Sequence, residues 1–536
     1  MPRFAAIDVG SNAMRLRIVE AQEPGAPRSL RGQLSLMPGD KGTSERDARG
    51  FRAVASLRAP VRLGSEVFVS GKLTPACIGQ ACAALREFRT AMDSANVDVY
   101  RATATSAVRE AENGATLAER ARREAGIELE VIEGIEEARL IQLAVVRRMG
   151  LEEKRALLVD VGGGSTELTV LDRGHASFSM SLPMGTVRLL ETFLRGAKTI
   201  GAEHARLLDE AIDRALHEAL PQIQKLAPFD VLVGTGGNID TLVDISPAKG
   251  GHAGYARAIE TSALRSLFGK FSKMTANERR DAWNLRPDRA DTIVPANAIF
   301  LHVAETLSLP AVVAPGVGLK EGILEEIVDK YFHVWDVAGE AENVLEACVR
   351  LGRRYQFDEA HGHRVTGFAT QLFDDLQSVH AFRDRDRLLL RAAAMLHDIG
   401  DFVRYDAHHK HSYYLIQHSD IMGLTPEERA IVANIARYHR KSLPDPAHPN
   451  FRDLDRDGRG KVRGLAAILR VADALDREHR GKVKSARAVV DRSAGKVRLF
   501  LRGHEDRELE EWTVRAKAEL LRDVYDLDVT IADDGP

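Results

Sequence analysis

The sequence predicts two α/β lobes with a cleft between them, followed by a helical region and a small α+β subdomain. Two observations carry this prediction. One glycine-rich acidic turn occurs twice, first in FAAIDVGSNAMRLRIVE and again in ALLVDVGGGSTELTVLD, and each copy opens the same order of strands and helices. Beyond about residue 335 the strand patterns give way to helical segments with many histidines.

The first lobe is expected over residues 1–132, where three strand-like segments precede alternating helices and strands. Thr74 before Pro75 is typical of a helix N-cap followed by proline at the first helical position. That helix should reach about residue 94, with strands near 97–103 and 128–132.

The second lobe is expected over residues 133–330 and repeats this order. A helix should begin near Gly134, and a short strand at Ala311–Ala314 should close the lobe. The strands between them are expected at 156–160, 165–171, 175–182 and 230–234.

The remaining chain should form two further parts. Residues 335–482 read as helices, with a polar loop between Asp445 and Arg463. Residues 483–536 show alternating segments at 485–491 and 496–502, a helical pattern near 506–521 and a strand pattern at 526–532. These predict a small α+β subdomain.

The composition is that of a globular protein with no polyanionic nucleic-acid partner. Hydrophobic residues make up 44% and charged residues 29% of the 536, and the formal net charge is −3. Cys77 and Cys82 fall in one predicted helix, where they should fill the core in a reducing compartment. No run of ~18 apolar residues occurs, so we expect a cytoplasmic protein without a membrane partner.

The repeated turn indicates phosphate chemistry with a divalent cation. Glycines let the backbone approach a ligand closely, and successive N–H groups in such a turn bind anions. Asp8 and Asp160, each at a strand end, would hold the cation through oxygen ligands. The expected phosphate-binding residues are Gly10, Ser11, Asn12, Gly163, Gly164, Ser165 and Thr166. Tight-turn chemistry alone would also explain these residue types, and the duplication favours ligand binding.

Six blocks in the first 330 residues make the chain resemble the exopolyphosphatase / guanosine pentaphosphate phosphohydrolase (Ppx/GppA) family. They are DVGSNAMRL, RATATSAVREAENG, GIEEARLI, DVGGGSTEL, LPMGTVRL and APGVGLKEGIL. The resemblance implies an α/β two-lobed actin-like (ribonuclease H-like) fold. It also implies an all-α HD-like domain over the helical region, before the small α+β C-terminal subdomain.

The same resemblance assigns catalytic roles. Glu137 would activate the attacking water, as hydrolysis of a phosphoanhydride requires, although a glutamate in a first helical turn can also serve the helix dipole. Glu167 would position water or metal, or lie on a polar strand face. Arg109 would bind phosphate oxygens, or be a solvated arginine. Gly236, in GTGGNID, would line the cleft.

A second metal site is implied by similarity to metal-dependent phosphohydrolases with an H…HD…D pattern. Its ligands would be His363, His397, Asp398 and Asp473, converging from separate helices. His408, His409, His411 and His418 form a nearby histidine-rich patch that would assist a metal, bind anions or remain on the surface.

The resulting hypothesis is an Mg²⁺-dependent (or other divalent-cation-dependent) exopolyphosphatase that removes terminal phosphate from inorganic polyphosphate. One alternative is hydrolysis of guanosine pentaphosphate (pppGpp) to ppGpp on the same scaffold. Another, of a different class, is a non-catalytic phosphate or alarmone sensor. The resemblance further implies a homodimer.

Overall fold

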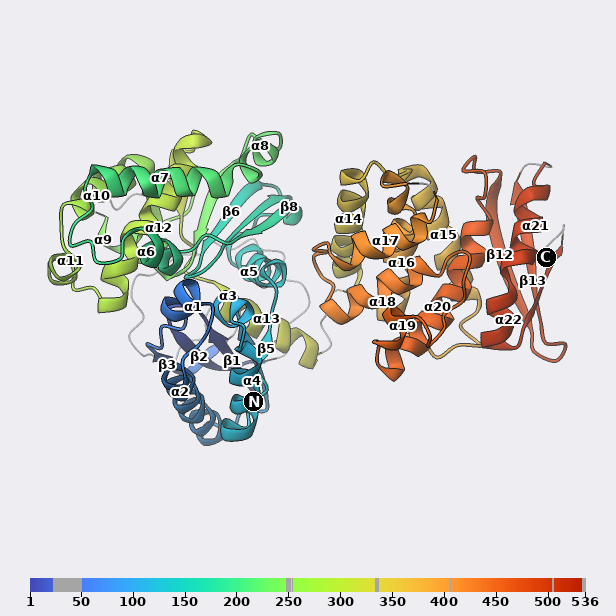
Figure 1. The fold of residues 1–536 in the computed structure, drawn as a ribbon, viewed down its shortest axis with the longest axis horizontal. Helices are drawn as coiled ribbons and strands as arrows, with labels where there is room; N and C mark the ends of the chain where they lie inside the picture. Colours follow the sequence, from blue (N-terminus) through green and yellow to red (C-terminus); the bar gives the residue numbers. More distant parts are fainter. Residues whose placement is uncertain are drawn as a thin grey trace. The chain divides into compact units, whose positions relative to one another are not determined.

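The computed structural model describes residues 1–22, 51–246, 252, 254–332, 337–404, 406–503 and 506–532. The chain divides into two compact units, Met1–Trp335 and Asp336–Pro536 (Figure 1).

The first sheet of the first unit has five strands in the order β3-β2-β1-β4-β5. β1 pairs antiparallel with β2 and parallel with β4. Its strands are β1 (Arg3–Val9), β2 (Met14–Glu20), β3 (Arg52–Ala59), β4 (Val99–Ala104) and β5 (Glu130–Val131). Its helices are α1 (Gly64–Ser70), α2 (Pro75–Ser94), α3 (Ser106–Glu110) and α4 (Gly114–Ala125). The Thr74 hydroxyl accepts a hydrogen bond from the Cys77 N–H, which confirms the predicted cap of α2.

The second sheet repeats that topology. Its order is β10-β11-β9-β6-β7-β8, so β8-β7-β6-β9-β11 matches β3-β2-β1-β4-β5 position by position. The added edge strand β10 (Ala258–Glu260), which pairs antiparallel with β11, was not expected from the sequence because it is very short. The other strands are β6 (Arg155–Val161), β7 (Thr166–Asp172), β8 (His175–Leu182), β9 (Val231–Thr235) and β11 (Ala311–Val313). The duplication predicted from the two turns therefore includes the strand order of both sheets, apart from the added strand β10.

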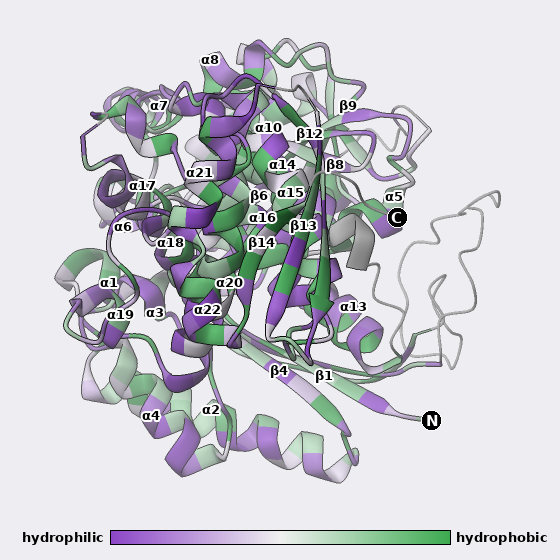
Figure 2. Ribbon diagram, turned by 90° about the vertical axis from the view of Figure 1, so that its right-hand side faces the viewer, coloured by the Kyte–Doolittle hydropathy of each residue, from purple (hydrophilic) through white to green (hydrophobic). Residues whose placement is uncertain are grey.

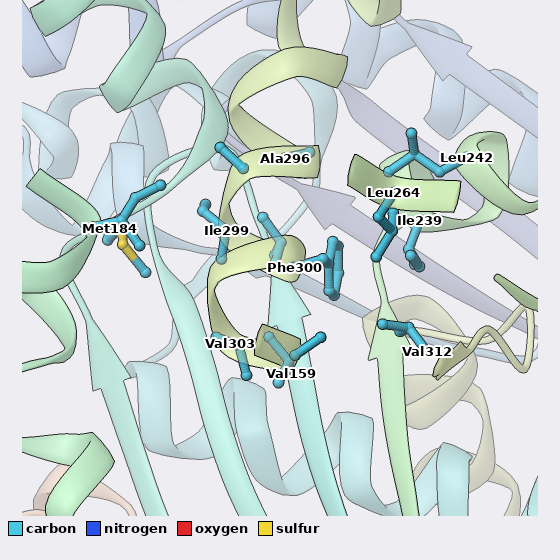
Figure 3. Packing of buried hydrophobic residues seen from close by; sticks show 14 of the residues in the cluster. Val159, Met184, Ile239, Leu242, Leu264, Ala296, Ile299, Phe300, Val303 and Val312 are labelled. Carbon is cyan, nitrogen blue, oxygen red and sulfur yellow. The ribbon is translucent and has the colours of Figure 1, made fainter. Parts of the chain in front are cut away.

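Helix α12 (Pro287–Thr306) packs its apolar face on this second sheet (Figure 3). Phe300 of α12 is fully buried beside Val159 of β6 and Val312 of β11. A Cβ on Gly234 of β9 would lie 2.9 Å from the Phe300 ring, so the ring occupies space that this glycine leaves open. The remaining helices of this lobe are α6 (Thr186–Phe193), α7 (Ala202–Leu216), α8 (Ala219–Gln224), α9 (Gly237–Ile245), α10 (Thr261–Ser272) and α11 (Ala276–Trp283).

Two helices connect the lobes. α5 (Gly134–Met149) contacts β7 and β8 of the second sheet, whereas α13 (Leu319–Phe332) contacts β1 and β4 of the first. The two helices also pack on each other, and they do so closely, because a Cβ on Gly322 would lie 2.0 Å from the carbonyl oxygen of Leu140. A helix at the end of the range expected for the second lobe thus covers the sheet of the first.

The second unit begins with helices and ends with a three-stranded sheet of order β12-β13-β14. Its strands are β12 (Val483–Asp491), β13 (Lys496–Gly503) and β14 (Asp528–Ala532). Its helices are α14 (Val337–Arg354), α15 (Glu359–Asp375), α16 (Asp384–Leu396), η1 (Ile399–Phe402), α17 (His408–Gln417), α18 (Pro426–Arg437), α19 (Pro449–Arg452), α20 (Arg456–Ala474), α21 (Glu508–Lys517) and α22 (Glu519–Tyr525). The loop predicted between Asp445 and Arg463 is partly wrong: Asp455 caps α20 by accepting from the Gly458 N–H, so the helix begins at Arg456.

Hydrophilic and hydrophobic residues alternate along the helices and strands (Figure 2). Helix α7 mixes hydrophilic and hydrophobic residues and turns Leu208, Ile212 and Leu216 inward, as an amphipathic surface helix does. The three cysteines are buried and unpaired with one another, in keeping with the expected core positions of Cys77 and Cys82. Among the described helices, none combines the length and apolarity needed to cross a bilayer.

Candidate active site

The two glycine-rich turns have the same local structure and touch each other. The Gly10 N–H donates to the Ala13 carbonyl at 3.2 Å, and the Gly162 N–H donates to the Ser165 carbonyl at 3.0 Å. A Cβ on Gly163 would lie 2.9 Å from the Cβ of Ser11, closer than such atoms approach. Glycine at 163 is therefore required for the lobes to meet at this point.

Three buried carboxylates converge beside the second turn. The strand register places Asp160 of β6 directly opposite Glu167 of β7, so both side chains lie on one face of the sheet. Glu137, in the first turn of α5, joins them, and one oxygen from each of the three lies within 4.8 Å of the others. The Oε2 atoms of Glu137 and Glu167 are buried without a hydrogen-bond partner among the described residues. Hard oxygen ligands in this arrangement fit a divalent cation.

The electrostatics of this carboxylate trio agree with that fit. Burial and the charges of Glu167 and Asp160 hold the pKa of Glu137 well above its usual range. Burial and Asp160 raise the pKa of Glu167 to about 8. Burial raises the pKa of Asp160 to about 6, against the hydrogen bond donated by Thr235 at 2.5 Å. The ionised forms of these three carboxyl groups are therefore disfavoured, and a bound cation would stabilise them.

The first turn differs from the second in charge. Its Asp8 stands opposite Arg15 in the strand register, where the second turn has Asp160 opposite Glu167. Arg15 forms an ion pair with Asp8 at 3.0 Å. Because Asp8 is neutralised within its own lobe, the uncompensated negative charge belongs to the second turn.

A cavity of about 370 Å³ joins both turns. Of the residues predicted from the sequence, its lining includes Asp8, Gly10, Ser11, Asn12, Glu137, Asp160, Gly163, Ser165 and Gly236. It also contains residues that sequence reasoning missed, among them Arg15, Arg286, Arg289 and Lys320. Nothing in the isolated motifs distinguishes these basic residues from solvated ones, although Arg15 lies within the repeated block itself.

Four predicted residues of the first unit do not line the cavity, and Glu167 of the carboxylate trio is one of them. Thr166 is fully buried and donates its hydroxyl proton to the Met184 carbonyl. A Cβ on Gly164 would collide with Phe68 and Ser106, so this glycine serves the contact between lobes rather than a ligand. Arg109 donates to the Ile132 carbonyl at 2.6 Å and acts on Glu137 through its charge.

In the second unit the structure corrects one predicted ligand. The side chain of His363 is 58% exposed and lies 3.7 Å from Glu359, away from His397, Asp398 and Asp473. His361 is in its place, 1% exposed, with its Nε2 atom 3.2 Å from that of His397. Residues two apart on a helix point to different sides, and here the packing of α15 on α16 and α20 turns His361 inward.

The fold and this pocket define an actin-like, two-lobed protein that handles phosphate. The sequence profile of the Ppx/GppA phosphatase family matches residues 43–331, and that of Ppx/GppA phosphatase domain III matches residues 346–523. The chain belongs to this family, whose members are phosphoanhydride hydrolases, and it is an enzyme of that class.

Individual relatives carry two different names. The guanosine-5'-triphosphate,3'-diphosphate pyrophosphatase of Photobacterium profundum is 27% identical over 444 residues, 82% of this chain and 81% of the relative. That of Aeromonas salmonicida is 26% identical over 476 residues, 88% and 87% of the two chains. An exopolyphosphatase structure from Cytophaga hutchinsonii superposes with a TM-score of 0.53 at 24% identity, covering 61% of this chain and 98% of its own, and so supports the fold.

Proposed function

We propose that this enzyme hydrolyses the terminal phosphoanhydride of inorganic polyphosphate. The observation that carries the proposal is that Glu137 and Asp160 of the carboxylate trio line one cavity together with basic side chains, among them Arg289, which lacks a hydrogen-bond acceptor at Nε among the described residues. A linear polyanion ending at a cation-assisted hydrolytic centre matches both features.

Arg289 is a basic residue of this lining that lacks a hydrogen-bond acceptor at Nε and is repelled by neighbouring arginines. It is 6% exposed, and its Nε atom is buried without a hydrogen-bond partner among the described residues. Burial, together with the charges of Arg15 and Arg286, lowers its pKa to about 10. A phosphate group beside it would relieve that repulsion and supply the missing acceptor.

The lining also favours a phosphate chain over a nucleotide. It consists of glycine, hydroxyl, amide, charged and aliphatic residues, and none of the lining residues within the described part of the chain is aromatic. A purine is commonly held by stacking on a ring or by an apolar slot. Most of the residues that line this cavity are polar or glycine.

In the proposed reaction the terminal phosphate lies against the two turns, and Glu137 orients a water in line with its phosphorus. The water oxygen bonds to phosphorus, the bridging P–O bond breaks and its oxygen leaves with the shortened chain, and the water's proton passes to the ionised carboxylate of Glu137. The products are orthophosphate and a chain shorter by one phosphate. A divalent cation held by Asp160 and Glu167, preferably Mg²⁺, would neutralise charge on the phosphoryl oxygens. Arg15 and Arg289 would bind the following phosphates.

A second candidate is hydrolysis of pppGpp, which rests on the names of the relatives that align over four-fifths of the chain or more. Both substrates present a terminal phosphoanhydride, so the same carboxylate trio would serve either one.

The test measures phosphate release from long-chain polyphosphate and from pppGpp, with and without Mg²⁺. Glu137→Gln should lower kcat by about 10²–10⁴-fold. The matched control is Glu136→Gln, because Glu136 is the neighbouring carboxylate and pairs with Arg139 at 2.7 Å outside the cavity. Arg289→Met should raise KM for polyphosphate more than for a single phosphate ester.

Each result has a definite meaning. Mg²⁺-dependent release from polyphosphate that Glu137→Gln abolishes supports the proposal. Release from pppGpp alone favours the second candidate. Tight binding of polyphosphate without turnover by the unaltered protein would favour the sensor hypothesis instead.

A further inference from the structure

Four polar side chains form one row across the second sheet, and Asp160 and Glu167 are its two middle members. In the strand register, Ser181 of β8 lies opposite Glu167 of β7, and Thr235 of β9 lies opposite Asp160 of β6. Asp160 and Glu167 lie opposite each other. Since partners in register point to the same face of a sheet, the order on that face is hydroxyl, carboxylate, carboxylate, hydroxyl.

Each hydroxyl donates a hydrogen bond to the carboxylate beside it. Ser181 Oγ is 2.7 Å from Oε1 of Glu167, and Thr235 Oγ1 is 2.5 Å from Oδ1 of Asp160. The other oxygen of Glu167, Oε2, is buried without a hydrogen-bond partner among the described residues. Each hydroxyl thus fixes the orientation of one carboxylate and leaves its second oxygen available to a cation.

Ser181 is also enclosed by helix α5, which carries Glu137 in its first turn. A Cβ on Gly134, the first residue of α5, would lie 2.1 Å from Oγ of Ser181 and 3.4 Å from Oε1 of Glu167. The glycine therefore leaves the space in which the serine hydroxyl reaches Glu167. Because Glu167 is 2% exposed and does not line the cavity, the position of its carboxylate depends on such internal contacts.

The corresponding row of the first sheet provides an internal comparison. It consists of Arg58, Arg15, Asp8 and Thr103, on β3, β2, β1 and β4. Arg15 forms an ion pair with Asp8, and the Thr103 hydroxyl donates to the Ile7 carbonyl at 3.5 Å. An arginine thus neutralises the carboxylate of the first row, whereas the hydroxyls of the second row leave the negative charge of its carboxylates uncancelled.

We propose that Ser181 and Thr235 are positioning residues that hold Glu167 and Asp160 in the orientation that binds the divalent cation. The inference rests on the function proposed above, which assigns the cation to these two carboxylates. A hydroxyl is suited to this task because it is neutral, so it orients a carboxylate without competing with the cation for its charge. Neither residue lines the cavity, so each acts through the carboxylate that it contacts.

The test is Mn²⁺ binding by the purified full chain without substrate, with free Mn²⁺ measured by its electron paramagnetic resonance signal. A double variant, Asp160→Asn with Glu167→Gln, lacks the site, so its binding measures any ions held elsewhere on the chain and is subtracted. The two variants under test are Ser181→Ala and Thr235→Val.

Each of these variants has a matched control. Ser179→Ala is the control for Ser181→Ala, because Ser179 lies two residues earlier on the same face of β8 and its hydroxyl is 3.1 Å from that of Thr169. Thr235→Ser is the control for Thr235→Val, because it keeps the hydroxyl. Thermal unfolding shows whether each protein is folded.

We expect Ser181→Ala and Thr235→Val each to weaken Mn²⁺ binding by about 10–100-fold, the loss typical of removing a group that orients a metal ligand. Ser179→Ala and Thr235→Ser should bind Mn²⁺ as tightly as the unaltered protein. In polyphosphate hydrolysis, Ser181→Ala should need more Mg²⁺ for its half-maximal rate, and excess Mg²⁺ should restore most of kcat. A hydroxyl with a purely structural role would lower the unfolding temperature and leave the metal affinity unchanged.

The outcomes separate this inference from the function on which it rests. Phosphate release by the unaltered protein, with Mn²⁺ affinity equal in Ser181→Ala and Ser179→Ala, would overturn the inference and leave the function standing. If Ser181→Ala does not fold, equal affinities in Thr235→Val and Thr235→Ser overturn it, and a loss in Thr235→Val alone supports it. Failure of the function would appear in the unaltered protein itself, as no release of phosphate from polyphosphate. Mn²⁺ binding no greater than that of the double variant would overturn both.

Discussion

Glu326 on α13 is buried and forms ion pairs with two arginines from other elements of the first unit. The effect of removing its charge can therefore be predicted in magnitude. Glu326 accepts hydrogen bonds from Arg101 of β4 at 2.5 Å and from Arg139 of α5 at 2.6 Å. Its side chain is 3% exposed. Burial alone would raise its pKa, but the two guanidinium groups prevail and lower it from 4.5 to about 2.

This depressed pKa translates into stability. At about 1.4 kcal/mol per pKa unit, the ionised carboxylate contributes about 3 kcal/mol to the free energy of unfolding at neutral pH. Because the pKa is lower in the folded state, the contribution is complete above pH 4.5 and disappears as the pH falls toward 2. Glu326→Gln should therefore destabilise the first unit by about 3 kcal/mol at pH 7 and by about 1 kcal/mol at pH 3.

The assay is urea unfolding followed by the fluorescence of Trp283, which packs against Phe271 in the first unit. Trp335 and Trp512 are replaced by phenylalanine in every protein compared. Glu130→Gln is the matched control, because Glu130 also pairs with Arg101 but is 50% exposed, and exposed pairs contribute less than about 1 kcal/mol. Equal losses in the two variants, or a loss for Glu326→Gln that does not shrink in acid, would refute the reasoning.

Two further predictions concern the first unit. Glu167→Gln should stabilise the metal-free protein by more than about 1 kcal/mol at pH 8 and leave it almost unchanged at pH 4. The folded-state pKa of Glu167 is about 8 against an ordinary 4.5, so the native carboxylate costs stability as the pH rises between these values; thermal unfolding in a chelator would show this, and no gain at pH 8 would contradict it. Gly163→Ala should cost about 1–3 kcal/mol, because its Cβ would lie 2.9 Å from that of Ser11. Gly79→Ala in α2, where a Cβ meets nothing within 4 Å, should gain up to about 1 kcal/mol in the same thermal unfolding experiment. A Gly163→Ala protein as stable as Gly79→Ala would show that the turns can separate without loss.

Much of the first unit follows from sequence because its signals are local. Alternating hydrophobic strands, the cap at Thr74 and the repeated turn each depend on neighbours within a few residues. The repeat also predicts that Asp8 and Asp160 meet, since corresponding strands end at corresponding edges, and both line one cavity. The edge strand β10 and the first turn of α20 were missed because short elements and side-chain caps carry little periodic signal.

The duplicated lobes, the two turns and the candidate carboxylates could be predicted from sequence because each is encoded in a contiguous motif. Which residues lie together in a site depends on the tertiary fold. It turned His361 rather than His363 inward, placed Arg15 opposite Asp8 where the second repeat has Glu167, and brought Arg289 to the cavity from a distant helix. The physical reason is that the charge and burial of a side chain depend on the elements packed against it, and those elements come from distant parts of the chain.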